Sequence, residues 1–323
     1  MSTPKRIKVD ELGALLSLPI DVFICSASFE DRCKTVSDNI NSEIVKQVII
    51  CENEDLKSII APNGNYLANK YGKKAKKIEL WTNDSLRGAD NLRSGLFELH
   101  SSVNSYLIDI STFTHEALLI LVKILRDIVK GKNKKIQFVY TSAKEYSLDF
   151  ENPEDKWLSK GIGEIRSVLG YPGITRPSRK AHLIVLLGFE SERAAKLIDS
   201  YEPAMVSIGL GADDSSISGK HHLVNQKFFN QVTEIYNNVN KFAFSCVDPF
   251  SAMRSIQDQM KKFEQFNTVV APMNNKISTL GAALAALDND SIQVCYAHAK
   301  QYNYENYSVP GDDCYLFDLE GYL

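Results

Sequence analysis

Residues 185–198, VLLGFESERAAKLI, place a glutamate and an arginine directly after a run of apolar residues. The apolar run predicts a buried strand that ends at Gly188, and the residues after it have the spacing of a helix. An earlier stretch at 22–35, VFICSASFEDRCKT, repeats this order with Glu30 and Arg32. A buried strand, a polar turn and a helix form the beginning of a βαβ unit, and the chain contains this beginning twice.

The same alternation of apolar strand and amphipathic helix runs through most of the chain. Apolar, β-branched segments predict strands at 21–27, 47–52, 77–82, 105–110 and 136–141, and again at 182–188, 204–209, 242–248, 267–272 and 291–297. Helical spacing predicts helices near 30–41, 55–71, 89–103 and 114–130, and near 190–200, 222–240, 249–265 and 276–287. Strands separated by helices form mostly parallel sheets. The predicted fold class is therefore α/β, with two tandem Rossmann-like parallel-sheet halves.

Residues 142–180 interrupt this alternation with prolines and glycines. We expect a short helix around Asp155–Val168 and then an extended linker, with the domain boundary near residue 175. The expected division is an N-terminal domain at 1–150, a connecting helix and Pro/Gly linker at 151–180, and a C-terminal domain at 181–323. The tyrosine-rich tail after Tyr302 is expected to fold back across the second crevice, as a lid or an added strand.

Further matches between the halves predict a diverged duplication. FVYTSAKEYS at 138–147 corresponds to VCYAHAKQYN at 294–303, with the tyrosines and the Ala-Lys pair in common. A polar turn follows the fourth strand of each half, STFTHE at 111–116 and MNNKIS at 273–278. These matches occur in the same order as the repeated Glu–Arg motif.

Composition narrows the class of protein. The chain has 323 residues, 44% of them hydrophobic and 24% charged, which is typical of a globular protein of two domains. A net charge of -3 argues against binding nucleic acid through the field of the whole protein. None of the six cysteines has C-x-x-C spacing, and no stretch reaches the roughly 18 apolar residues of a membrane span. We expect a cytoplasmic protein with buried thiols and no membrane contact.

The candidate ligand site lies at the carboxyl ends of the strands, where the strand order of a parallel sheet reverses. The first and fourth strands flank that point, so the turns after them should meet there. The first half contributes polar side chains at Ser26, Ser28, Glu30, Arg32, Thr112 and Thr114. The second half contributes Gly188, Glu190, Arg193, Asn274, Asn275, Lys276 and Thr279.

Lys276 favours an anionic ligand in the second half. A lysine at a helix N-terminus opposes the helix dipole, and a bound phosphate would offset that cost. The alternative is that Lys276 simply points into solvent.

Two interpretations of the Glu–Arg motif remain open, a ligand-binding role and a structural one. Glu190 suits the first turn of a helix, and a pair three residues apart is an ordinary surface ion pair. Glu30 and Arg32 are two residues apart and would not face each other on a helix. A buried role between the halves is a further option.

Two other sets of residues could recognise nucleotides or nucleic acid. Lys144 with Tyr146, and Lys300 with Tyr302 near His298, could stack a base and hold a phosphate, or cap the sheet. The basic runs are either solvated helix ends or a nucleic-acid or partner surface at the opposite edge of the first sheet. Their residues are Lys73, Lys74, Lys76 and Lys77, and Lys132, Lys134 and Lys135.

Familiar catalytic and cofactor motifs are absent from the sequence. There is no P-loop, no complete G-x-G-x-x-G, no G-x-S-x-G and no H-E-x-x-H. His221 and His222 are expected in a loop, without partners at metal-ligand spacing. We expect neither a metal nor a cofactor, and we lean against an enzyme.

The segment VVAPMNNKISTLGAAL at 269–284 resembles the ligand-binding turn of CARF-type domains, the Rossmann-like sensors of cyclic oligonucleotides in prokaryotic immunity. The likeness covers mainly residues 242–297. It implies that Asn275, Lys276 and Thr279 touch ligand phosphate. The chain departs from the family in having Asn-Asn where Gly-Thr or a similar pair is more typical, and no effector nuclease domain follows.

Three functions remain open. The first is a nucleotide-sensing or interaction protein that binds a phosphorylated small molecule and acts on a partner protein in prokaryotic defence or stress. The second is an enzyme acting on a nucleotide or nucleoside, a hydrolase or transferase, with Glu190 or Glu30 as the catalytic residue. The third is a structural scaffold without a ligand, which crevices filled by the protein's own side chains would favour.

Overall fold

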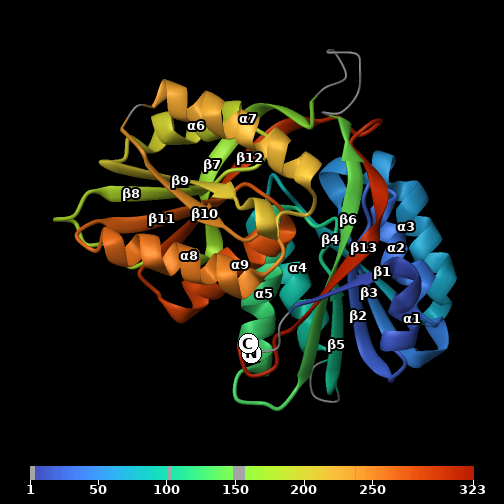
Figure 1. Ribbon diagram of the computed structural model, residues 1–323. Helices are drawn as coiled ribbons and strands as arrows, with labels where there is room; N and C mark the ends of the chain where they lie inside the picture. Colours follow the sequence, from blue (N-terminus) through green and yellow to red (C-terminus); the bar gives the residue numbers. More distant parts are fainter. Residues whose placement is uncertain (1–3, 100–102, 148–156, 237) are drawn as a thin grey trace. The chain divides into compact units, whose positions relative to one another are not determined.

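A computed structural model describes residues 4–99, 103–147, 157–236 and 238–323. The chain forms two compact units, each assembled from separated parts of the sequence (Figure 1). Unit 1 comprises residues 1–117, 124–157 and 303–323, and unit 2 comprises residues 118–123 and 158–302. The units are therefore not the contiguous domains expected from the sequence.

Unit 1 contains a seven-stranded sheet in the order β1-β13-β6-β5-β2-β3-β4. Its strands are β1 (Lys5–Lys8), β2 (Ile20–Ser26), β3 (Val45–Asn53), β4 (Ala75–Leu80), β5 (Ser105–Asp109), β6 (Lys135–Tyr146) and β13 (Ser308–Asp318). Its helices are α1 (Leu12–Leu15), α2 (Arg32–Asn39), α3 (Lys57–Tyr71), α4 (Ser85–Phe97) and the two ends of α5 (His115–Val129), whose residues 118–123 belong to unit 2. Strands β2 to β6 are parallel, and β13 is antiparallel to both of its neighbours.

Unit 2 contains a six-stranded sheet in the order β10-β9-β8-β11-β12-β7. Its strands are β7 (Ser159–Pro172), β8 (Ala181–Leu186), β9 (Met205–Gly211), β10 (Asn240–Phe244), β11 (Asn267–Pro272) and β12 (Ile292–Tyr302). Its helices are α6 (Ser191–Tyr201), α7 (Gly219–Ile235), α8 (Pro249–Lys262) and α9 (Lys276–Asp288). Only β7 is antiparallel among these strands.

The two sheets share one topology. Strands β4-β3-β2-β5-β6-β13 of unit 1 correspond in order and direction to β10-β9-β8-β11-β12-β7 of unit 2. The order of the parallel strands reverses between β2 and β5 in unit 1, and between β8 and β11 in unit 2. Both units are thus Rossmann-like, and the α/β fold with two such halves is confirmed.

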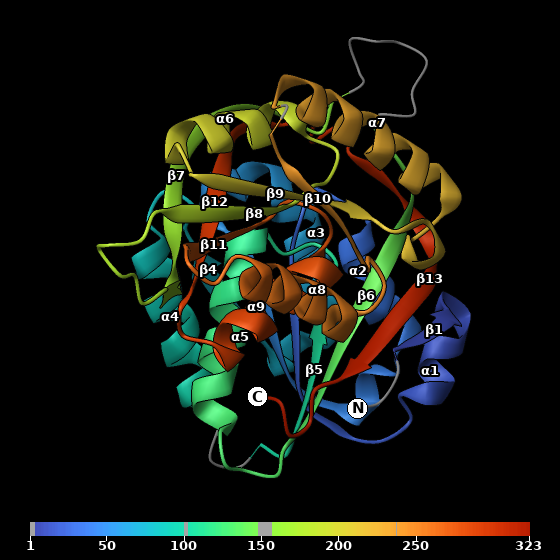
Figure 2. The same ribbon diagram turned by 60° about the vertical axis from the view of Figure 1, so that its left-hand side comes forward.

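Each sheet has five parallel strands and an antiparallel strand beside the fifth of them. In each unit this antiparallel strand comes from the chain segment that follows the fifth parallel strand of the other unit. Strand β7 follows β6 in sequence but pairs with β12, whereas β13 follows β12 but pairs with β6. Figure 2 shows β7 beside β12 and β13 beside β6. We call β7 and β13 the exchanged strands.

This exchange corrects two expectations. The short helix expected around Asp155–Val168 is wrong, because residues 159–172 form strand β7, while 155 and 156 lie outside the described residues. The tail after Tyr302 does supply an added strand, but it joins the sheet of the first half and not the second.

His221 and His222 lie in the first turn of α7, not in a loop as expected from the sequence.

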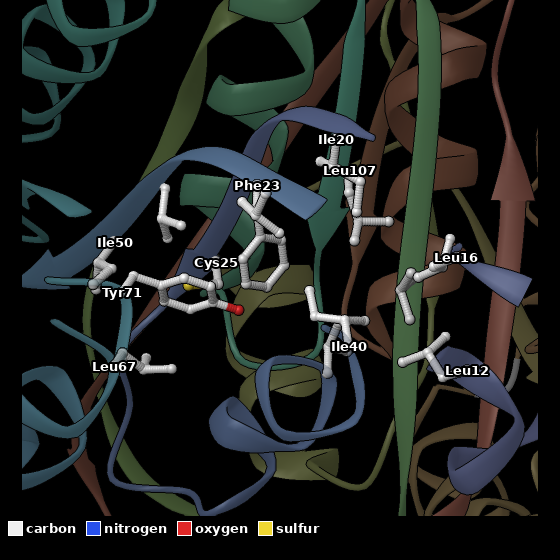
Figure 3. Close-up of a cluster of buried hydrophobic side chains, with 14 of the residues drawn as sticks. Leu12, Leu16, Ile20, Phe23, Cys25, Ile40, Ile50, Leu67, Tyr71 and Leu107 are labelled. Atoms are coloured by element: carbon white, nitrogen blue, oxygen red, sulfur yellow. The ribbon is translucent and has the colours of Figure 1, made fainter. Parts of the chain in front are cut away.

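Apolar strand residues form the core of each unit. In unit 1, β2 and β3 direct residues such as Phe23, Cys25 and Ile50 toward Leu67 and Tyr71 of α3 (Figure 3). A second cluster in unit 2 packs β8, β9 and β11 against α6 and α7. Strands covered on both faces explain the continuous apolar runs of the sequence. None of the described helices is both long and apolar enough to cross a membrane.

Candidate functional site

The Glu–Arg motif of unit 1 forms a buried clamp at the carboxyl end of the sheet. Arg32, at the start of α2, donates from Nε and Nη2 to Glu30 Oε2 at 3.0 and 2.6 Å. Its Nη1 donates to the carbonyl of Thr141 on β6 at 3.0 Å. Ser308, the first residue of β13, donates its hydroxyl to the same carboxylate. One ion pair thus joins the turn after the first strand to the fifth strand and the exchanged strand.

Unit 2 repeats these contacts at the corresponding positions. Arg193 donates to Glu190 and to the carbonyl of Ala297 on β12, and Ser159 of β7 donates to Glu190. Ala297 is the residue that aligns with Thr141 when 138–147 is matched to 294–303. We call each set of four residues a Glu–Arg clamp.

The exchanged strands enter the two clamps in the same register. Ser308 lies opposite Tyr146 in the β13–β6 ladder, and Ser159 lies opposite Tyr302 in the β7–β12 ladder. These tyrosines are the second tyrosines of the matched segments. In both ladders the pairing becomes irregular next to the carbonyl that accepts from the arginine.

The clamps favour the structural interpretation of the repeated motif. Arg32 is only 3% exposed and its guanidinium contacts lie within unit 1. Burial by itself lowers the pKa of Arg32, but the adjacent Glu30 carboxylate together with Tyr146 and Tyr140 outweighs burial and holds that pKa above its ordinary value. The guanidinium therefore stays charged, and removing either partner would leave a buried charge without its counterion.

The turns after the first and fourth strands of unit 1 are tied together by their own side chains. Thr112 donates its hydroxyl to the carbonyl of Ser26 at 2.9 Å, and Asn63 of α3 donates to the carbonyl of Ser28 at 2.8 Å. Thr114 caps α5 by accepting from the backbone N–H of Ala117. The structure brings the predicted residues of this edge together, with their hydroxyls used inside the protein.

The corresponding turns of unit 2 are joined by amide side chains. Asn274 donates to the carbonyl of Leu187 at 2.7 Å, and Asn225 of α7 donates to the carbonyl of Gly188 at 2.9 Å. Asn275 caps α9 by accepting from the N–H of Ser278, and its own amide donates to the carbonyl of Cys246 at 2.7 Å. The turns after β8, β10 and β11 are thereby held as one edge.

Gly188 allows the close approach of two of these turns. A Cβ atom at this position would lie 2.2 Å from the carbonyl oxygen of Met273 and 3.1 Å from Cα of Asn274. Real Cβ atoms do not approach this closely, so only glycine fits here without a shift of the backbone.

The first turn of α9 places a lysine at this edge. Lys276 is the first residue of the helix and is half-buried, as are Asn274 and Asn275 before it. The helix N-terminus adds a partial positive charge to that of Lys276. Thr279 is fully buried and donates its hydroxyl to the carbonyl of Asn275 at 3.0 Å, so it supports the turn from behind.

The Ala-Lys-x-Tyr segments lie at the ends of β6 and β12. Lys144 and Lys300 are exposed, and Tyr146 and Tyr302 are half-buried. In unit 1 the ring of Tyr146 lies 5.9 Å from the Arg32 guanidinium. In unit 2, His298 stacks with Tyr296 at 6.5 Å, and the Tyr296 and Tyr302 hydroxyls are 3.5 Å apart. The Tyr146 ring therefore packs beside the clamp of unit 1.

A buried carboxylate in unit 1 has no counterpart in unit 2. Asp109, at the end of β5, accepts from the backbone N–H and hydroxyl of Ser111 through Oδ1. Its Oδ2 has no hydrogen-bond partner among the described residues. Burial raises its pKa from 3.8 to about 6, against the opposing effect of Ser111. The strand register places Ala271 at the corresponding position of β11.

Most lysines of the two basic runs have contacts within unit 1. Lys74 and Lys134 donate to backbone carbonyls of Ser42 and Val103, and Lys132 to Ile128. Lys76 and Lys77 form ion pairs with Glu98 and Glu52. Lys73 lies in the 3-10 turn Gly72–Lys74, and Lys135 is the first residue of β6. These contacts resemble those of ordinary helix ends and strand edges.

Metal clusters and surface grooves are two other kinds of candidate site. Within the described residues, no group of three or more His, Cys, Asp or Glu side chains is placed to hold a metal ion. A shallow groove of about 690 Å³ in unit 2 lies at the amino-terminal edge of its sheet, opposite the clamp. It is lined mainly by apolar residues of the α6 and α7 C-termini, with Asp199 and Glu202 among them.

Comparison with known proteins establishes the fold and nothing finer. No protein-family profile and no curated protein sequence matches the chain. A Type III CRISPR defence DNA nuclease activated by cyclic oligoadenylate matches at a TM-score of 0.50 and 5% identity, over 90% of this chain and 67% of that one. The likeness to CARF-type, Rossmann-like proteins is thus confirmed at the level of the fold.

Two other solved structures match more weakly. A twin-arginine translocation pathway signal protein from Burkholderia phytofirmans matches at a TM-score of 0.27 and 12% identity, over 84% of this chain and 67% of that one. The cytoplasmic domain of a prokaryotic cation chloride cotransporter matches at 0.25 and 9% identity, over 89% and 99%.

Sequence reasoning missed the serines and asparagines that complete the two edges. Ser159 and Ser308 lie on exchanged strands that the apolar pattern did not indicate. Asn63 and Asn225 occupy corresponding places on α3 and α7 and bond the same carbonyl position after the first strand. Asparagines at matching places in the second helix of each half are the signal that could have identified them.

Proposed function

We propose that the protein senses a phosphorylated small molecule, a nucleotide, at the edge of unit 2 formed by the turns after β8 and β11. Lys276 and the half-buried Asn274–Asn275 turn would contact phosphate, and Gly188 would let the neighbouring turn approach. The observation that carries the proposal is the position of Lys276. It is the first residue of α9, directly beyond the point where the strand order reverses.

The choice of nucleotide follows from the comparison of folds. The matching defence nuclease is activated by cyclic oligoadenylate, and cyclic oligoadenylates are therefore the first ligands to test on this chain. By the same reasoning we propose a role in prokaryotic defence, in the cytoplasm, with a protein partner that receives the signal.

The proposal gives unit 1 a supporting role. Thr112 joins its two turns, Asn63 of α3 holds the turn after β2, and its Glu–Arg clamp is buried. The clamps also weaken the enzyme alternative, because Glu30 and Glu190 each accept from an arginine and a serine. A carboxylate held in this way is poorly placed to exchange protons with a substrate.

Ligand-induced stabilisation tests the proposal directly. The full chain is unfolded thermally with AMP, ATP, cyclic dinucleotides, and linear and cyclic oligoadenylates. A ligand at a hundred times its Kd should stabilise the folded state by about 2.7 kcal/mol. Lys276→Ala should weaken binding about tenfold or more, since a hydrogen bond to a charged group contributes roughly 1.5–3 kcal/mol.

Lys261→Ala is the matched control, an exposed lysine in the last turn of α8 in the same unit. It should leave the affinity unchanged. Binding that survives Lys276→Ala, or that both variants weaken equally, would place the ligand elsewhere. No shift with any nucleotide would leave the scaffold as the better interpretation.

A further inference from the structure

The two Glu–Arg clamps lie at the ends of one short stretch of chain. Tyr302, opposite Ser159 in unit 2, is separated from Ser308 of the unit 1 clamp only by residues 303–307. On the other side, Tyr146 lies opposite Ser308 and precedes Ser159 by one connection. Each clamp therefore holds a strand whose continuation is held by the other clamp.

The segment between the clamps is itself tied down within unit 1. Asn303 is buried and donates to the carbonyl of Trp157 at 3.0 Å, and Ser147 donates its hydroxyl to the same carbonyl at 2.6 Å. The backbone N–H of Ser147 donates to the carbonyl of Tyr307 at 3.1 Å. The residues that follow β6 and β12 are thus bonded to Trp157, two residues before the start of β7.

Residue 307 links this segment to the turn after the first strand. The ring of Tyr307 lies 5.5 Å from Phe29 and 6.3 Å from Tyr146. Phe29 directly precedes Glu30 of the unit 1 clamp. A movement of residues 303–307 would therefore disturb the ring packing and the carboxylate of the clamp together.

We propose that the two clamps are coupled, so that loosening the clamp of one unit loosens the exchanged strand held by the other. Glu190 lies in the turn after the first strand of unit 2, and Glu30 lies in the same turn of unit 1. Coupling would transmit a change at either turn to the sheet of the other unit along the chain. The inference does not depend on the identity of any ligand.

Hydrogen exchange with mass spectrometry tests the coupling on the full chain without ligand. Ser159→Ala removes only the bond between β7 and Glu190, and leaves the Glu190–Arg193 ion pair in place. Amides at the start of β7 should exchange about tenfold faster, because a bond to a charged acceptor is lost. If the clamps are coupled, the exchange rates of amides at the end of β6 and the start of β13 in unit 1 should also rise, by at least about threefold.

Ser167→Ala is the matched control, since Ser167 lies on the same strand but contacts Gln293 instead of the clamp. It should leave β6 and β13 at their wild-type rates. The proposal would be overturned if Ser159→Ala also left β6 and β13 at their wild-type exchange rates. It would likewise be overturned if both variants accelerated exchange in these strands equally.

The reciprocal variant supplies a second criterion. Because a coupling free energy acts equally in both directions, Ser308→Ala must accelerate exchange at β7 and the end of β12. An effect confined to β13 and β6 would contradict the coupling. Neither outcome bears on nucleotide binding, so the two proposals fail separately.

Discussion

Replacement of Asp109 by asparagine should change the stability of unit 1 in a way that depends on pH. Relative to wild type, the variant should be more stable at pH 8 than it is at pH 4. The carboxyl group is 2% exposed, and burial raises its pKa from 3.8 to about 6. A difference of about two pKa units corresponds to roughly 3 kcal/mol. Because the folded pKa is the higher one, the contribution of Asp109 is fully present below about pH 4 and is lost as the pH rises through 6.

The variant removes this titration and keeps the local hydrogen bonds. The amide oxygen of asparagine can accept from Ser111 as the carboxylate Oδ1 does, but the side chain does not ionise. The stability of Asp109→Asn relative to wild type should therefore increase by about 3 kcal/mol between pH 4 and pH 8. Comparing the two pH values cancels any constant effect of the new amide group.

Urea unfolding followed by tryptophan fluorescence measures this difference. The chain has two tryptophans, Trp81 and Trp157, and both belong to unit 1, so the transition reports that unit. Free energies of unfolding are determined for both proteins across the pH range. Equal differences at pH 4 and pH 8 would refute the reasoning, since they would mean that Asp109 titrates normally in the folded protein.

Asp21 provides a control of opposite sign. Burial raises the pKa of Asp21, but its ion pair with Lys46 and the backbone N–H of Asn104 outweigh burial and lower that pKa. Its stabilising contribution is present above its unfolded pKa and is lost at acid pH. Asp21→Asn should therefore lose stability relative to wild type as the pH rises from 3 to 6.

Two further predictions concern the clamp and the edge of unit 2. Arg32→Met leaves the Glu30 carboxylate buried without its counterion and should lower the free energy of unfolding by about 3–5 kcal/mol. Adding Glu30→Gln to this variant should restore part of the lost stability. Urea unfolding by tryptophan fluorescence measures both, and a double variant no more stable than Arg32→Met would contradict the role given to the ion pair. Gly188→Ala forces the backbone away from Met273 and should cost about 1–3 kcal/mol in thermal unfolding. Gly219→Ala, where an added Cβ contacts nothing within 4 Å, should not destabilise, and equal losses in the two variants would contradict the close approach.

The sequence was sufficient for the parallel strands and most of the helices. Buried strands of a parallel sheet are apolar on both faces, so each of the ten expected strands coincides with an observed one. The spacing within helices predicted α5 almost to the residue, from the Thr114 cap to its end at Val129. Boundaries shifted more where polar residues begin a helix, as at α4, which starts at Ser85 and not near residue 89.

Strands β1 and β7 were missed, and β13 was assigned to the wrong sheet, because these strands pair at the edges or on the antiparallel side of the sheets. Their residues alternate or mix exposure, and β7 contains glycines and charged residues that weaken any apolar pattern. Pairing across long sequence separations leaves no local signal. The partners of Glu30 and Glu190 could not be deduced for the same reason, although the recurrence of the motif is visible in the sequence.

Exchange of the sixth strands has a consequence for synthesis on the ribosome. The edge of β6 stays open until Ser308–Asp318 has been made, more than 150 residues later, although β2 to β6 are complete long before. An open strand edge can pair with another chain, and the exposed interval lasts about 10–30 s at ordinary rates of elongation. Nascent chains of this protein should therefore be more prone to aggregate than finished ones, and they should need chaperones during translation.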